Sequence, residues 1–170
     1  MAYTTNWKHL SQAVGCQPIA ETSTTPLHPL GAIRQAVDRG ANSNGAGEFI
    51  YLSGAASTVA GSWVTYNLDD GSTTLLAANA IGPVAIAMAA TLAGQYGWYQ
   101  IQGKAVGNAL TGFLDNANVY ATATAGSVDD AVVAGDRVKG ALGASALDFP
   151  ATGKAEFELA RPFMDDGLAA

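Results

Sequence analysis

The sequence predicts an all-β, β-dominated fold: a compact β-barrel or sandwich of short strands with an extended N-terminal arm. The chain has 20 glycines in 170 residues and only 13% charged residues, whereas about 25% is usual. Between Asp70 and Asp129 the only charged side chains are Lys104 and Asp115. So little charge is expected where a sheet is covered on both faces or where one face meets another subunit.

The length suits one domain with its own core, and no change in composition divides the chain. We expect residues 1–30 to form the arm and residues 31–170 to form a single β-rich domain. The arm is polar and contains three prolines. Trp7, Leu10 and Val14 have helical spacing, so a short helix over Trp7–Val14 is one interpretation. A disordered tail and an arm that orders only against a neighbouring subunit are the alternatives.

The first expected strand of the domain covers residues 31–38, at an edge of the sheet. One or two turns of helix are the alternative there. The glycine-rich run Gly40–Gly47 predicts a loop that joins this strand, as a hairpin, to a strand over Glu48–Ser53. A second hairpin is expected over Trp63–Leu68 and Thr73–Ala77, because Asp69, Asp70 and Gly71 between them tolerate the positive φ of a tight turn.

Large and small side chains alternate over Val84–Ala90, which predicts a strand with two different faces. We expect Val84, Ile86 and Met88 to face a core, and the alanines between them to allow a neighbour to approach closely.

Alternation also predicts a strand over Gly97–Gly103. Tyr99 and Ile101 share one of its faces. The other face carries Trp98, Gln100 and Gln102 and offers uncharged groups that hydrogen-bond. We expect part of the charge-poor stretch to be an interface, with Lys104 and Asp115 at its rim. The candidate interface residues are Trp7, Leu10, Trp63, Trp98, Gln100 and Gln102.

Three strands complete the set, over Val119–Thr124, Arg137–Leu142 and Lys154–Arg161. In the last one we expect Ala155, Phe157 and Leu159 to face the core, and Lys154, Glu156 and Glu158 to face water. A motif Val-Ala-Gly-x-x-Val begins at both Val59 and Val133. It predicts a tight turn into a strand; an internal duplication is the alternative.

The charge balance argues against nucleic acid as a partner, because a formal charge of -6 repels phosphate. The single Cys16 excludes an intrachain disulfide framework and allows folding in a reducing cytoplasm. No signal peptide is recognisable, and the longest apolar stretch, Ala80–Gly94, is shorter than the ~20 residues of a membrane-spanning helix. We therefore expect no membrane partner.

No motif predicts an enzyme, a cofactor or a metal site. The only histidines, His9 and His28, lie in the expected arm without metal-ligand spacing. No nucleophile elbow, phosphate-binding loop or dinucleotide fingerprint is present. Glu156 and Glu158 share a strand face, but the alternation around them indicates a solvated face rather than a catalytic pair.

A carbohydrate-binding or host-surface adhesion module of a virion is the alternative function. Its sugar-binding groove would be lined by aromatic and amide side chains. These are Trp63, Tyr96, Trp98, Tyr99, Gln100, Gln102 and Asn108.

Four segments resemble small structural proteins of tailed bacteriophages, namely the head decoration or cement proteins. The segments are Gly47–Leu52, Val59–Tyr66, Gly97–Gly103 and Thr124–Asp136. The resemblance covers about residues 31–163. It implies a β-rich, non-catalytic protein, made in the host cytoplasm, that binds the major capsid protein on the outer surface of the virion and braces the shell. We also expect self-association, as a trimer or dimer.

Overall fold

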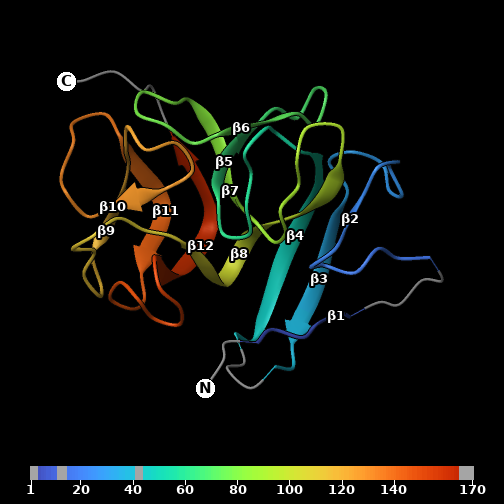
Figure 1. Ribbon diagram of the computed structural model, residues 1–170, viewed down its shortest axis with the longest axis horizontal. Helices are drawn as coiled ribbons and strands as arrows, with labels where there is room; N and C mark the ends of the chain where they lie inside the picture. Colours follow the sequence, from blue (N-terminus) through green and yellow to red (C-terminus); the bar gives the residue numbers. More distant parts are fainter. Residues whose placement is uncertain (1–3, 11–14, 41–43, 165–170) are drawn as a thin grey trace.

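The computed structural model describes residues 4–10, 15–40 and 44–164, and these contain strands but no helix (Figure 1). The predicted all-β class is thereby confirmed. The strands are β1 (Trp7–His9), β2 (Thr22–Ser23), β3 (Ile33–Asp38), β4 (Ala46–Ser53), β5 (Trp63–Tyr66), β6 (Thr73–Leu75), β7 (Gly82–Ala87), β8 (Tyr96–Asn108), β9 (Asn118–Ala121), β10 (Val128–Asp129), β11 (Arg137–Gly143) and β12 (Lys154–Met164).

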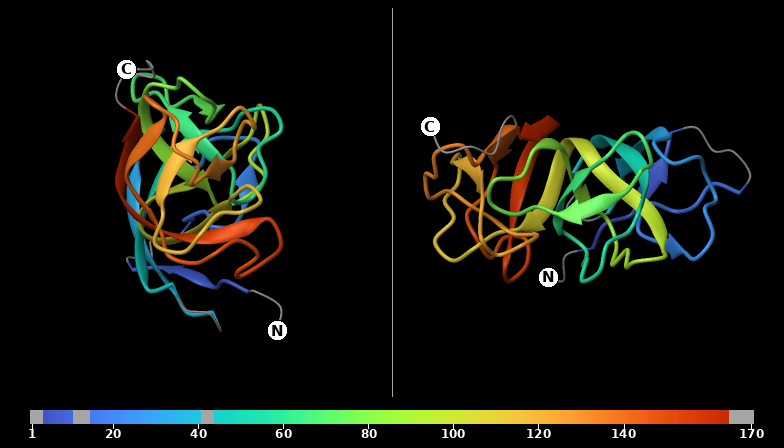
Figure 2. Two further views of the ribbon diagram at one scale, coloured as in Figure 1. Left: turned by 90° about the vertical axis from the view of Figure 1, so that its left-hand side faces the viewer. Right: turned by 90° about the horizontal axis from the view of Figure 1, so that it is seen from above.

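The strands form one antiparallel sheet that does not close into a barrel. Its main order is β1-β3-β4-β8-β7-β12-β11-β9-β10, and the hairpin β5-β6 joins it through β7. Strands β1 to β4 lie at one end of the molecule and β9 to β12 at the other, with β5 to β8 between them (Figures 1 and 2).

Strand β8, the longest at 13 residues, connects the two ends. Residues 96–102 pair with β4, and residues 102–108 pair with β12. Between these two halves Gly103 has a φ of +92°, a conformation that costs side-chain-bearing residues free energy. The carbonyl oxygen of Ala46 lies against its Cα, where a Cβ would clash. Glycine at this position therefore allows the bend.

Three apolar clusters fill the interior. The largest lies among β5, β7, the second half of β8, β9, β11 and β12, and includes Val84, Ile86 and Phe157. A second includes Ala85 and Ala87 with Tyr99 and Ile101. The predicted alternation is confirmed for Val84 to Ala87, and both faces of β7 are covered, but Met88 lies beyond the end of the strand and packs against the third cluster instead of joining Val84 and Ile86. The third cluster lies on the opposite face of β4 and β8 from the second.

Part of the expected N-terminal arm, residues 1–30, lies in the third cluster. Trp7 packs edge-on against Phe49 with ring centroids 4.9 Å apart, and Ile19 is buried in the same cluster. Residues 7–9 form a strand paired with β3, so the helix considered there is wrong over Trp7–His9. Positions 11–14 lie outside the described residues. Pairing with β3 explains why strand geometry prevails over the helical spacing.

The hairpin expected from Asp69, Asp70 and Gly71 is confirmed, because β5 pairs with β6. The strand expected over residues 31–38 is confirmed as β3, but its position at an edge is wrong. β3 lies between β1 and β4, and β1 forms the edge instead.

Each of the two Val-Ala-Gly-x-x-Val motifs forms a turn, and the two turns are of the same type. The N–H groups of Ser62 and Asp136 donate to the carbonyl oxygen three residues earlier, at 3.0 and 3.2 Å. Gly61 and Gly135 have positive φ inside these turns. Each turn leads into a strand, β5 or β11, as the motif predicts.

The outward face predicted for β12 is right for Glu158, but Lys154 is only partly exposed and Glu156 is buried. Glu156 is only 4% exposed, and its carboxylate forms an ion pair with Lys104 Nζ at 2.7 Å. Its main-chain groups bond the segment after β11: Ser145 Oγ accepts from the Glu156 N–H, and the Glu156 carbonyl accepts from the Ala144 N–H. The ion pair compensates for the loss of water around the carboxylate.

Substitution of Gly103 by alanine is expected to lower the free energy of unfolding by about 3 kcal/mol or more, from strained φ and the clash with Ala46. Gly112→Ala is the matched control, because Gly112 has a φ of +102° but no atom near its missing Cβ. We expect Gly112→Ala to lower the free energy of unfolding by about 1 kcal/mol. Urea denaturation of both variants measures the difference, and equal losses would contradict the role of the close contact.

Replacing Glu156 by glutamine is expected to destabilise the protein by about 1–2 kcal/mol, because the charge-assisted hydrogen bond is lost while Lys104, which is 37% exposed, remains in contact with water. Glu158→Gln removes an exposed carboxylate from the same strand and should stay within about 0.5 kcal/mol of wild type. Thermal and urea denaturation would check both values. A solvated Glu156 would instead make the two variants indistinguishable.

Candidate functional site

Two hollows adjoin the N-terminal end of the sheet, and residues in or next to β1 contribute to both. Trp7, in β1, lines a cavity of about 290 Å³. Leu10, immediately after β1, lines a smaller hollow of about 180 Å³. We call these the Trp7 cavity and the Leu10 hollow. Strand alternation directs the side chains of Trp7 and Leu10 to opposite faces of the sheet.

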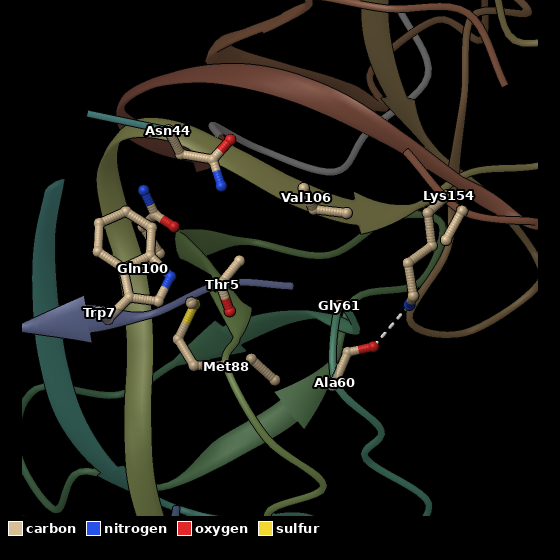
Figure 3. A pocket seen from close by; sticks show the side chains of 11 residues that line it. Thr5, Trp7, Asn44, Ala60, Gly61, Met88, Gln100, Val106 and Lys154 are labelled. Carbon is tan, nitrogen blue, oxygen red and sulfur yellow. Dashed lines mark hydrogen bonds between the residues drawn. The ribbon is translucent and has the colours of Figure 1, made fainter. Parts of the chain in front are cut away.

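The Trp7 cavity collects side chains from distant parts of the chain (Figure 3). Gln100 and Val106 come from β8, Met88 follows β7, and Lys154 begins β12. Most of the wall between the polar groups is made of methyl and methylene groups. An apolar pocket with a few directed polar groups is the usual form of a small-molecule site.

Gln100 adjoins this cavity, but its amide is buried beneath the wall and is not open to the cavity. Its side chain is 0% exposed, and Nε2 donates to the carbonyl oxygens of Gln102 at 3.1 Å and Lys104 at 2.9 Å. These two acceptors determine the orientation of the amide, since a flip would bring three oxygens together. Within the described part of the chain, Oε1 has no hydrogen-bond partner.

Trp7 also adjoins the cavity, but its indole nitrogen is buried within the wall. The residue is 8% exposed, and its Nε1–H finds no acceptor among the residues that the structure describes. Buried polar groups without partners are rare in native proteins. Trp7 and Gln100 lie side by side on one wall (Figure 3).

Lys154 lies at the other side of the Trp7 cavity. Its Nζ donates to the Ala60 carbonyl at 2.7 Å, the bond drawn in Figure 3, and to Asn108 Oδ1 at 2.6 Å. Burial lowers the pKa of its amine. An ammonium group has three N–H donors, so one remains for a further acceptor.

The Leu10 hollow differs from the Trp7 cavity in its lining, which includes the carboxylate of Glu48. Leu10 is 57% exposed. The Glu48 carboxylate accepts from Gln35 Nε2 at 3.2 Å and forms an ion pair with Arg161 at 2.7 Å. These contacts lower the pKa of Glu48, with the Gln35 hydrogen bond as the largest cause.

Gln100 and Gln102 do not share a face, contrary to the expectation from alternation. Phe49 of β4 pairs with Gln100, whereas the preceding Glu48 pairs with Gln102. Cross-strand partners point to the same face, and Glu48 and Phe49, being consecutive, point to opposite ones. This register shift places Gln100 at the Trp7 cavity and Gln102, which is exposed, at the Leu10 hollow.

Trp63 and Trp98, the remaining candidate interface residues, are both 0% exposed and offer no surface to a partner. Trp63 packs edge-on against Phe157, with ring centroids 4.8 Å apart. Trp98 lies in the third cluster, and its Nε1 donates to the Gln17 carbonyl at 2.9 Å. Both rings lie in the core, where large aromatic side chains contribute strongly to the stability of the fold.

Gln17 holds the N-terminal segment and thereby positions β1. Its carbonyl lies 2.9 Å from His9 Nε2, its side-chain Oε1 accepts from the Tyr51 hydroxyl at 2.7 Å, and its N–H donates to His28 Nε2 at 3.1 Å. Sequence reasoning did not identify Gln17, because a glutamine in a polar segment carries no signal of burial.

No group of three or more His, Cys, Asp or Glu side chains in the described ranges is placed to hold a metal ion. The same residues contain no helix long and apolar enough to cross a membrane. The chain matches none of the protein-family models, curated proteins or solved structures with which it was compared.

The hydrogen bond from Gln17 to His28 predicts that the free energy of unfolding decreases as the pH falls below about 6.5, the ordinary pKa of histidine. Partial burial, followed by the charges of Arg34 and His9, lowers the pKa of His28, and only neutral Nε2 accepts from Gln17. Because the unfolded state then binds the proton more readily, stability is full above 6.5 and declines as the pH falls through the lower folded-state pKa.

Urea denaturation between pH 5 and 8 measures this dependence. His28→Gln, which supplies an amide oxygen near the position of Nε2 and does not titrate, should show a shallower decline than wild type. Identical pH profiles for the two proteins would contradict the role of His28.

Proposed function

We propose that this protein is a non-catalytic structural component of a tailed-phage virion that binds the outer surface of the major capsid protein shell and stabilises the head. The family resemblance of residues 31–163 suggests this role. The observation that carries it is an unpaired sheet edge beside exposed apolar side chains at one end of the molecule.

The edge belongs to β1, which ends the strand order and pairs only with β3 in the described part of the chain. The outward N–H and C=O groups of an edge strand can take another strand. Addition of a strand supplies main-chain hydrogen bonds, while neighbouring side chains give specificity. A segment of the capsid protein is the proposed added strand.

The surface next to this edge suits a protein partner rather than a charged polymer. Leu10, after β1, and Ile33, at the start of β3, are exposed. Lys8 of β1 is exposed as well, and the nearby Glu48 forms an ion pair with Arg161. Contact with this surface buries apolar area.

Because the contacts between this protein and the shell repeat over a symmetric surface, a modest affinity at each contact is sufficient for stable binding. Each copy that bridges two capsid subunits gains from effective concentration, since its second contact forms within the assembly. Association of the protein with itself, as a trimer or dimer, would add to the same effect and is part of this proposal.

The sugar-binding alternative drawn from Trp63 and Trp98 is not retained in that form. Both rings are 0% exposed, and neither can stack on a ligand.

Co-sedimentation with expanded, undecorated capsids tests the proposal. We expect the wild-type protein to bind and to raise the temperature at which the shells rupture. Leu10→Asp places a charge beside the edge and should weaken binding at least tenfold, about 1.4 kcal/mol.

Leu114→Asp is the matched control, because Leu114 is similarly exposed but lies outside both hollows. Both variants should retain the circular dichroism spectrum of wild type. Absence of binding by the wild-type protein would refute the proposal, and equal losses for the two variants would refute the location of the interface.

A further inference from the structure

We propose that the Trp7 cavity binds a small aliphatic monocarboxylate, whose carboxylate pairs with the ammonium group of Lys154 and whose hydrocarbon chain lies against the apolar wall. This site goes beyond the proposed capsid contact, because the cavity and the Leu10 hollow share no lining residue among those described.

The charge of the cavity comes from Lys154. Among the described residues that line it, this side chain alone carries a charge. Its Nζ donates to two neutral acceptors, the Ala60 carbonyl at 2.7 Å and Asn108 Oδ1 at 2.6 Å. No carboxylate in the described part of the chain forms an ion pair with it. The site therefore presents one positive charge without a counter-charge.

A bound anion would compensate for the partial burial of this ammonium group. Burial alone lowers the pKa of Lys154, and no neighbouring carboxylate raises it. A charge that leaves water without an opposite charge nearby is unfavourable, whereas a charge-assisted hydrogen bond to a carboxylate is strong. One ammonium group balances one negative charge, so the cavity suits a monocarboxylate better than a phosphate, which carries nearly two.

The turn before β5 holds the ammonium group in place. A Cβ at Gly61 would lie 2.6 Å from Lys154 Nζ, so glycine at this position leaves the room that the amine occupies. The preceding residue, Ala60, supplies one of the two acceptors. Because two of the three N–H groups are used in these bonds, the third is available to a ligand. Figure 3 shows the amine beside Ala60, across the cavity from Trp7 and Gln100.

The rest of the lining favours a hydrocarbon chain over a sugar or polyol. Met88, Val106, Ala87 and Ala151 contribute methyl and methylene groups, and the unbranched thioether of methionine adapts to the shape of an apolar ligand. The polar atoms of Trp7 and Gln100 are buried within the wall. At about 290 Å³ the cavity lies at the lower end of small-molecule sites, which span ~300–1,000 Å³. This size favours a short acid.

Nitrogen-resolved NMR of the full chain tests the proposal with hexanoate as the probe. At millimolar concentrations hexanoate should shift the main-chain amide signals of Gly61, Val106 and Ala151, while those of β9 to β11 remain in place as internal controls. Hexanamide has nearly the same shape but no charge and should bind at least tenfold more weakly. Acetate keeps the charge but lacks the chain, and we expect at least fivefold weaker binding.

Variants then separate the charge from the apolar wall. Lys154→Gln removes the charge and should weaken hexanoate binding at least tenfold. Lys8→Gln is the matched control, because Lys8 is exposed and lies outside the lining; its effect should stay within twofold. Val106→Phe fills part of the cavity with Lys154 intact and should also weaken binding at least tenfold, so it tests the site even where Lys154→Gln fails to fold.

Several results would overturn the proposal. Equal binding of hexanoate and hexanamide, or unchanged binding by Lys154→Gln, would refute pairing with the ammonium group. Equal losses in Lys154→Gln and Lys8→Gln would indicate general attraction of anions. Acetate binding as tight as that of hexanoate would refute the role of the apolar wall, and absence of any shift would refute the site itself. Each result leaves the capsid proposal standing, because co-sedimentation measures capsid binding separately.

Discussion

The continuity of β8 through its bend at Gly103 is the constraint on which the rest of the structure depends. One half of this strand pairs with β4 and the other with β12, so β8, together with β7, which pairs with both β8 and β12, joins the two ends of the molecule. The bend needs a positive φ and a close contact with Ala46 that only glycine allows. Loss of this geometry would break the pairing of β8 with one of its two partners.

The N-terminal segment is part of this architecture. Gln17 bonds Trp98 and Tyr51 through its carbonyl and side chain, and these bonds keep the segment over the third cluster. They also fix β1, from which Trp7 reaches one hollow while Leu10 reaches the other just beyond the strand. One short strand and the residue after it thus adjoin two hollows with different linings.

The charge-poor stretch between Asp70 and Asp129 has three different uses in the fold. Much of it is core, including Val84, Ile86 and the alanines of β7. Gln100 is buried next to the Trp7 cavity, and Gln102 lines the Leu10 hollow. Lys104 forms an ion pair with the buried Glu156. A lack of charge therefore reflects burial on both faces more than a single contact surface.

The local sequence pattern was sufficient to predict the all-β class, the β5-β6 hairpin and the two faces of β7, because alternation and turn chemistry act within a few residues. Tertiary structure decided the rest. Pairing with β3 made residues 7–9 a strand, a register shift opposite Glu48 and Phe49 separated Gln100 from Gln102, and the Lys104 ion pair allowed Glu156 to be buried. Each depends on a partner distant in the chain, which local periodicity does not encode.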